Sequence, residues 1–482
     1  MNQTTRIIST GLAAHEAQVA LDLETLNLPP RNWVPALRRD GVSVLDVVVI
    51  GAGMNGIAAA GALIFKGIRN IAVLEESASG QEGPWVTTAR MDTLRSPKTL
   101  PGPCFGIPSL TFRAWYEASF GSEAWEALYK IHNSTWQDYL SWLQRALKLP
   151  VTHGVRVLRI SAAEGLLRLN LSDGRTMLTR RVVMATGRAG AGGLHVPDFV
   201  DADLFPDLAA LAPTPIDFEA LRGRSLGLIG GGASAWDNAA TALERGAAEA
   251  HLYVRRATLP QINKGRGSAG PGFHVGWHSL SVEERWNLIV YMHDAQAPPP
   301  HETVKRALRL PNFHIHLATP VRSAWRDGAQ VVLDLGEGRQ ARHDFLIVGT
   351  GFVVDLDRVP ELADFAPHIA RWQDRYTPPP GMQRRELAAF PFLGAGFELQ
   401  PRDAAAPPEL GLIHLMNYGA HVSHGGIASD IPGVAVAGER VAVHILRHFF
   451  QGEIGALRQE LEAFDEPELE GTPFFVPRGS AP

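Results

Sequence analysis

Two patterns of apolar positions divide the chain into predicted strands and helices. Apolar residues at a spacing of three to four between Thr111 and Leu149 predict a helical segment. Alternating positions at 155–160 and 166–171 predict a hairpin. Short continuous apolar runs predict strands buried on both faces of a parallel sheet, and they occur at 45–50, 71–74, 181–185, 225–229, 251–254 and 344–348. This mixture of strands and helices predicts an α/β fold.

A glycine-rich turn follows the first of these strands. Gly51, Gly53 and Gly56 form G-x-G-x-x-G before a predicted helix at 57–66, and Glu75 lies at the tip of the next strand. Gly51 permits a tight turn, Gly53 lets a pyrophosphate approach the backbone, and Gly56 lets helix and strand pack closely. The phosphates would rest at the positive end of the helix, and Glu75 would accept hydrogen bonds from a ribose. The turn therefore predicts a site for FAD or NAD.

The same arrangement recurs after the strand at 225–229. Gly230, Gly232 and Ala235 form G-x-G-x-x-A, with Ser234 inside the turn. At the tip of the next strand, where the first unit has Glu75, stand Arg255 and Arg256. Arginines suit a 2′-phosphate, so this unit predicts an NADPH site and leaves FAD for the first; the alternative that both arginines merely face water stays open.

The order of these units predicts two nested dinucleotide-binding, Rossmann-like domains, the FAD domain being interrupted by the NADPH domain. The predicted parts are an N-terminal extension (1–44), the first part of the FAD domain (45–200, with a helical insertion at about 109–149), the NADPH domain (218–338), and the second part of the FAD domain with a C-terminal helix (339–482).

Composition and cysteine content exclude several classes of protein. The net charge of -5 provides no general attraction for nucleic acid or an anionic membrane. We find no apolar run long enough for a membrane span and no signal-peptide pattern at the N-terminus, so we expect a cytoplasmic protein. Cys104 is the single cysteine, which excludes an intramolecular disulfide, a redox dithiol and zinc sites containing several cysteines. We predict no metal site and expect Cys104 to be a small buried residue rather than a nucleophile.

Several segments resemble the class B flavin monooxygenase superfamily. They are GAGMNG from Gly51, GPW at 83–85, ATG at 185–187, GGGASAWD from Gly230, GTGF at 349–352, and NYGAHVSHGGIASDIPG from Asn417. By this resemblance, Trp85, Thr186, Gly187 and Gly351 would also contact cofactor. The segment 199–218 contains no histidine, unlike the F-x-G-x-x-x-H motif of the flavin-containing and Baeyer-Villiger branches. TLRSPKTLPGP from Thr93 and LTFRAWYEA from Leu110 are similar to a smaller bacterial group of FAD-dependent urate hydroxylases and aspartate N-monooxygenases.

The resemblance implies a reaction and a substrate class. NADPH would reduce FAD, oxygen would add to form a C4a-hydroperoxyflavin, and one oxygen atom would pass to a small, anionic substrate. Cations in the loop-rich stretches would bind that substrate, with Arg95 and Lys98 favoured over Arg90, Lys264 and Arg266. His421 and His424 would lie near the flavin and orient substrate or carry a proton. For each of these residues, a surface or packing role is the alternative.

Three functions are compatible with these observations. The favoured one is monooxygenation, with urate hydroxylation as the specific reaction and an amino-acid (aspartate-like) N-hydroxylase as its alternative. The second is an NADPH-flavin reductase or oxidase that produces peroxide, and the third a protein that senses nucleotides. The expected partners are a small molecule and oxygen, without nucleic acid or membrane, and a homo-oligomer stays open.

Overall fold

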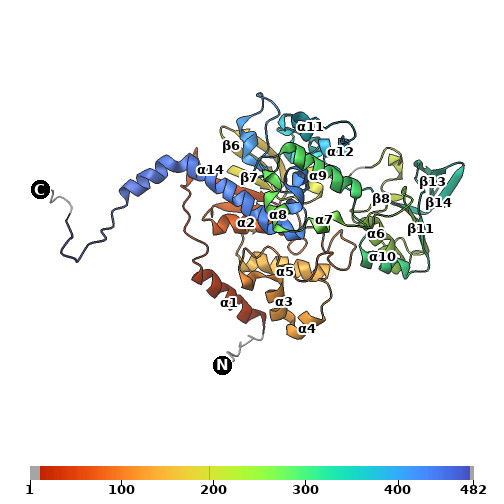
Figure 1. The fold of residues 1–482 in the computed structure, drawn as a ribbon, viewed down its shortest axis with the longest axis horizontal. Helices are drawn as coiled ribbons and strands as arrows, with labels where there is room; N and C mark the ends of the chain where they lie inside the picture. Colours follow the sequence, from red (N-terminus) through yellow and green to blue (C-terminus); the bar gives the residue numbers. More distant parts are fainter. Residues whose placement is uncertain (1–10, 195, 478–482) are drawn as a thin grey trace.

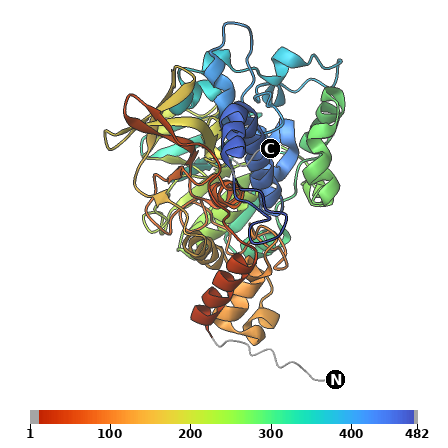
Figure 2. The same cartoon turned by 90° about the vertical axis from the view of Figure 1, so that its left-hand side faces the viewer.

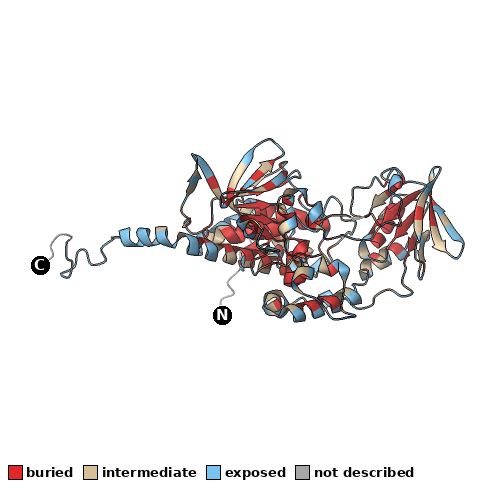
Figure 3. Ribbon diagram, turned by 90° about the horizontal axis from the view of Figure 1, so that it is seen from above, coloured by how far each residue is buried: buried red, intermediate tan, exposed pale blue. Residues whose placement is uncertain are grey.

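The computed structural model describes residues 11–194 and 196–477. Figure 1 shows two sheet-containing lobes side by side, with a group of helices below the first. Seen from above, each lobe has its own buried interior (Figure 3). Among the described residues, no helix combines the length and the apolar character that a membrane crossing requires.

The first sheet is built from both ends of the chain. In spatial order its strands are β4 (Val151–Thr152), β3 (Ile71–Leu74), β2 (Val42–Ile50), β7 (Thr176–Met184), β6 (Leu166–Leu171) and β5 (Val157–Ala163). β1 (Leu37–Arg39) pairs with β2, and β16 (Ile413–Leu415) pairs with β7. The predicted hairpin is confirmed as the antiparallel pair of β5 and β6.

The second sheet comes entirely from the middle of the chain. Its parallel strands are, in order, β11 (Phe313–His316), β10 (Glu249–Tyr253), β9 (Ser225–Ile229), β15 (Phe345–Val348) and β8 (Ala209–Leu211). A small antiparallel sheet of β12 (Ser323–Asp327), β13 (Gln330–Gly336) and β14 (Arg339–His343) packs beside it. The predicted α/β class with two nested units is therefore confirmed, while the predicted boundaries of the domains remain a proposal.

Helices cover both sheets. The longer ones are α1 (Leu12–Thr25), α2 (Met54–Phe65), α3 (Phe112–Phe120), α5 (Asn133–Ala146), α6 (Ala233–Glu244), α9 (Val282–Ala295), α10 (His301–Leu308) and α14 (Val434–Ala463). The shorter ones are α4 (Ser122–Ala127), α7 (Lys264–Gly267), α8 (Pro271–Gly276), α11 (Trp372–Arg375), α12 (Arg385–Ala388) and α13 (His421–His424). α14 packs closely against α2, because Gly438 leaves room for the carbonyl oxygen of Ala58. Its last turns project into solvent (Figure 1).

The predicted helical insertion is a compact group of helices, α3 to α5, joined by α1. Figure 2 shows α1 and this group together at the lower end of the molecule. Its tryptophans, Trp115, Trp125, Trp136 and Trp142, are all buried, so these large side chains form the core of the group. Cys104 is buried in the same cluster. Val19 and His15 of α1 are also buried there, while most other residues of α1 are exposed, so α1 is a surface helix attached by two buried side chains.

Candidate active site

The carboxyl ends of four strands meet at one edge of the first sheet. Ile50 of β2, Met184 of β7 and Leu415 of β16 stand in register, and Leu74 of β3 lies on the other side of Ile50. Ligands of parallel α/β sheets bind at this edge. The segments that leave it are therefore the ones that can face a cofactor: the glycine turn at 51–56, the loop from Ala185 and the loop from Met416.

The three glycines of the first turn differ in what surrounds them. A Cβ on Gly51, whose φ is +98°, would lie 2.7 Å from the carbonyl oxygen of Ala185, and one on Gly56 would lie 1.9 Å from that of Gly51. A Cβ on Gly53 would meet nothing within 4 Å. Gly51 and Gly56 are thus required by the fold itself. The surroundings of Gly53, at the N-cap of α2, leave the open approach that a pyrophosphate needs.

Glu75 is buried and positioned by the backbone. One carboxylate oxygen accepts a hydrogen bond from Ala52 N at 2.7 Å, and the other accepts one from Ser77 N at 2.9 Å. Each oxygen keeps a second lone pair, so the carboxylate can still accept the two hydroxyls of a ribose. Gln144 of α5 donates to the carbonyl of Ala52 at 2.7 Å and fixes the same turn from the other side.

The second sheet repeats this geometry. Ile229 of β9 stands in register with Tyr253 of β10 and Val348 of β15. Gly230 has a φ of +123°, and its Cβ would lie 2.4 Å from the carbonyl oxygen of Gly349, whereas a Cβ on Gly232 would meet nothing. Ser234 is exposed in the first turn of α6. Gly351 lies in the loop after β15, again with nothing within 4 Å of its Cβ position.

Arg255 and Arg256 follow β10 at this edge. Arg255 is exposed and Arg256 half-buried. Within the described ranges 11–194 and 196–477, neither guanidinium forms a hydrogen bond or an ion pair. Two guanidinium groups without a counter-charge beside an open glycine turn fit a 2′-phosphate.

A buried amide network connects the segments at the first edge. Asn417 donates to Thr186 Oγ1 at 3.0 Å and to the carbonyl of Gly190 at 3.1 Å. Asn55 of α2 donates to the carbonyls of Met416 and Ala428 at 3.1 and 2.7 Å. The ATG loop, which includes Gly187, is therefore held against the 416–428 segment and the glycine turn. Asn417 was not singled out from the sequence, although it directly follows a strand end.

The two predicted histidines have different environments. His424 is fully buried; its Nδ1 accepts from Arg440 at 2.9 Å, so its Nε2–H donates to the carbonyl of Gly394 at 2.9 Å. With both nitrogens bonded inside the core, His424 cannot contact a substrate, and the structure corrects its expected catalytic role to a packing role. His421 is only half-buried, stacks on Tyr418 with 5.7 Å between ring centroids, and has an Nδ1 without a hydrogen-bond partner. Burial lowers the pKa of His421, so its imidazole is neutral near pH 7.

A set of charged side chains surrounds Tyr418 and His421 between the two lobes. Arg188 lies over the Tyr418 ring, 5.4 Å from its centroid, and forms an ion pair of 3.5 Å with Asp430. Arg95 is close enough to both for their charges to interact, and it reaches across the lobes to Asp237 of α6 at 3.7 Å. Arg95 thus lies at the junction of the two lobes, and its predicted contact with substrate stays a prediction. Arg188 was missed, although it directly follows Gly187 at a strand end.

The remaining predicted residues lie elsewhere. Lys98 donates to the carbonyl of Trp125 at 2.7 Å and so binds the end of α4 rather than an open site. Trp85 is half-buried against Trp136, with 6.3 Å between ring centroids. Lys264 lies over Tyr291, and Arg266 is exposed. Lys98 thus stabilises the end of α4. Its predicted role in binding substrate and the predicted role of Trp85 in binding cofactor both stay predictions.

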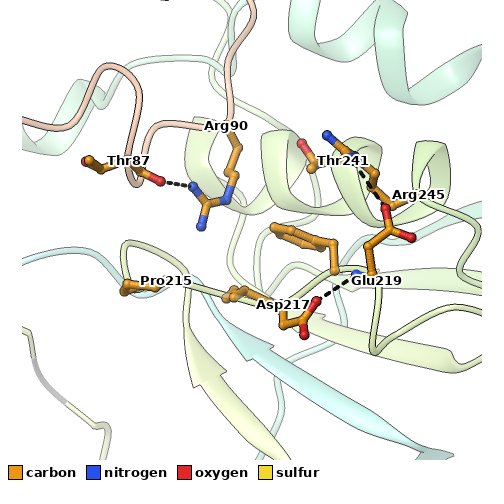
Figure 4. Close-up of a pocket in the computed structure, with 9 residues that line it drawn as sticks. Thr87, Arg90, Pro215, Asp217, Glu219, Thr241 and Arg245 are labelled. Atoms are coloured by element: carbon orange, nitrogen blue, oxygen red, sulfur yellow. Dashed lines mark hydrogen bonds and ion pairs between the residues drawn. The ribbon is translucent and has the colours of Figure 1, made fainter. Parts of the chain in front are cut away.

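Arg90 lines a cavity of about 670 Å³ between the lobes. Its guanidinium donates to the carbonyls of Thr87 and Thr214 and lies over the Phe218 ring. Figure 4 shows Thr241 and Arg245 on the opposite wall. Both belong to the C-terminal end of α6 and its following residue, whereas nucleotide phosphates would rest at the N-terminal end. This cavity is therefore separate from the cofactor edges.

Comparison with known proteins agrees with this geometry. Residues 48–265 match the family model described as pyridine nucleotide-disulphide oxidoreductase. The FAD-dependent urate hydroxylase of Xanthomonas campestris is 39% identical over 465 residues, which cover 95% of this chain and 98% of that protein.

Solved structures share the fold at low sequence identity. The ornithine hydroxylase of Pseudomonas aeruginosa has a TM-score of 0.63 at 18% identity, covering 84% of this chain and 99% of that one. The L-lysine 6-monooxygenase of Pseudomonas syringae has a TM-score of 0.63 at 16% identity, with the same coverage. With a relative this similar over nearly its full length, the chain belongs to the family of the FAD-dependent urate hydroxylase and is an FAD-dependent monooxygenase.

Proposed function

We propose that this FAD-dependent monooxygenase uses NADPH and oxygen to hydroxylate urate. The observation that carries the proposal is the 39% identity to a urate hydroxylase over almost all of both chains. The two unpaired arginines after β10 favour NADPH over NADH, because a 2′-phosphate would supply their missing counter-charge. When bound, the flavin supplies hydride acceptance and oxygen activation.

The chain's own residues would bind and orient the substrate. Urate is a planar anion, and the junction offers two guanidinium groups, Arg95 and Arg188, beside the aromatic ring of Tyr418. Guanidinium groups bind planar anions through paired hydrogen bonds and stack on aromatic rings. His421, neutral and with a free ring nitrogen, can accept a proton from a substrate nitrogen or hold it by a hydrogen bond.

The experiment is a panel of purines and amino acids given to the purified enzyme loaded with FAD. Urate should stimulate NADPH oxidation and yield a product one oxygen atom heavier than urate, with little free peroxide. Stimulation by aspartate or ornithine but not by urate would replace the proposal with an N-hydroxylase. Peroxide release without an oxygenated product from any compound would indicate an oxidase.

A further inference from the structure

Three potential metal ligands meet outside the set of residues assigned to the candidate active site. They are Glu398, His414 of β16, and His444 of α14, and their ligand atoms all lie within 4.8 Å of one another. Glu398 and His414 face each other as a cross-strand pair, and His444 comes from the neighbouring helix. The sequence separation of these residues explains why no metal site was predicted from the sequence. Rigid elements position all three, which favours a defined site.

His414 is prepared to act as a ligand. Its Nδ1 lies 2.8 Å from the carbonyl oxygen of Gly396, which can only accept, so Nδ1 carries the hydrogen. Nε2 is therefore a lone pair; it is buried and has no hydrogen-bond partner. A backbone carbonyl that fixes the far nitrogen is the usual support of a metal-binding histidine. A buried nitrogen without a partner calls for an unseen ion or water.

The spacing of Glu398 and His444 fits a shared ion. Their closest oxygen and nitrogen are 3.5 Å apart, which is longer than a good hydrogen bond of about 2.7–3.2 Å. Tetrahedral zinc with bonds of about 2.1 Å holds its ligand atoms about 3.4 Å apart. Burial raises the pKa of Glu398, because its carboxylate lacks a full counter-charge.

Two glycines make room for this arrangement. A Cβ on Gly394 would lie 1.8 Å from Glu398 Oε1, and one on Gly396 would lie 2.1 Å from the His444 ring. Neither glycine has a positive φ, so backbone conformation does not require them. The space they leave is used by the ligand side chains.

Nearby residues affect the proposed metal site but leave its fourth coordination position open. His448, one helical turn after His444 and exposed, has its ring centroid 4.4 Å from that of His444, so the fourth position lies toward solvent. Burial, with a smaller contribution from the Arg181 charge, lowers the pKa of His414, His444 and His448. The lowered pKa keeps these imidazoles neutral and able to bind metal. The positive charge of Arg181 also repels a cation, so we expect weaker binding than at a closed structural zinc site.

A second cluster in the NADPH unit provides a comparison. Glu249, His251 and His314 also lie within 4.8 Å of one another. There, however, His251 Nδ1 is hydrogen-bonded to His316 at 3.0 Å, and Ser225 donates to Glu249 at 2.7 Å. His251 Nε2 also lies 3.2 Å from a Glu249 oxygen in an ion pair, and His314 is exposed. This cluster serves as the control.

We propose that Glu398, His414 and His444 bind a divalent transition-metal ion of the zinc class, with the fourth position open to solvent. Two imidazoles and one carboxylate are a ligand set that zinc accepts. The ion would tie β16 to the middle of α14. Between these two elements runs the 416–433 segment, which carries Asn417, Tyr418 and His421, so the ion would restrain the ends of that segment without touching the flavin.

The test uses the full-length enzyme loaded with FAD, treated with a chelator, and then titrated with zinc chloride. We expect one equivalent of zinc per chain by calorimetry and metal analysis, together with a raised melting temperature. His444→Gln and Glu398→Gln should each weaken binding by about tenfold or more while FAD content stays normal. His251→Gln, in the control cluster, should bind zinc like the unaltered enzyme.

Cobalt gives an independent readout. Cobalt(II) at this site should show the ligand-field bands of four-coordinate cobalt, at longer wavelength than the flavin absorption, and His444→Gln should lose them. Absence of a stoichiometric zinc site would overturn the proposal. Equal zinc binding by His444→Gln and the unaltered enzyme would do so as well, as would a loss confined to His251→Gln.

Discussion

Replacing Gly53 by alanine should remove FAD without unfolding the protein. Gly53 has a φ of -67° and a ψ of -171°, which alanine adopts freely, and its Cβ would enter open space. The new methyl carbon stands about 1.5 Å from Cα, on the side from which the pyrophosphate approaches. The phosphate must then withdraw and lose a charge-assisted bond to the backbone, worth roughly 1.5–3 kcal/mol. FAD affinity should therefore fall by about 10- to 100-fold.

Gly56→Ala is the matched control, because its Cβ would lie 1.9 Å from a backbone oxygen and must displace α2. The assay titrates the apoprotein of each variant with FAD and follows thermal unfolding by circular dichroism. We expect Gly53→Ala to unfold like the unaltered apoprotein but to bind FAD weakly, and Gly56→Ala to be unstable. A Gly53→Ala variant with unaltered FAD affinity would show that the pyrophosphate does not approach this turn.

Four further substitutions test other parts of the structure. Arg255→Ala should raise the KM for NADPH by about tenfold or more and leave that for NADH unchanged, since one charge-assisted bond to the 2′-phosphate is lost; equal effects on both would refute the assignment. Burial raises the pKa of Asp46 to about 6 from 3.8, so its contribution to stability is complete below about pH 4 and is lost as the pH rises through 6. In denaturant unfolding, the free energy of unfolding of Asp46→Asn, taken relative to that of the unaltered protein, should accordingly rise by about 3 kcal/mol between pH 4 and pH 7. A difference that stays constant with pH would contradict the pKa shift. Arg95→Ala should raise the KM for substrate with normal flavin content, whereas Lys98→Ala should lower the melting temperature and leave that KM unchanged; the reverse pattern in steady-state kinetics would restore Lys98 as a substrate ligand.

The backbone of both nucleotide units could be predicted from the sequence because it depends on local chemistry. Glycine spacing, apolar runs and the residue at the strand tip all lie within about thirty residues of one another. Glu75 and Gly53 accordingly occupy positions suited to their expected roles. Arg95 was named only as a cation of a loop-rich stretch beside the site, and its position between the lobes could not be predicted.

Side chains whose contacts are distant in sequence could not be placed in this way. The partners of His424 are Gly394 and Arg440, and no local pattern shows that these three meet in the core. The contact of Lys98 could not be predicted for the same reason, because its acceptor is the carbonyl at the end of a helix that the loop crosses. The hydrogen bond from Asn417 to Thr186 likewise joins positions 231 residues apart.

The pairing of β16 with β7 has a consequence for biosynthesis. All five strands of the second sheet have been synthesised once the ribosome has passed residue 348. The first sheet, in contrast, gains its last strand only at residues 413–415. Domains fold as units during synthesis, so the NADPH unit can be complete while the FAD site still lacks Asn417 and α14. Flavin can therefore be captured only near the end of translation, and a chain cut short before β16 would hold a finished nucleotide fold that has no flavin partner.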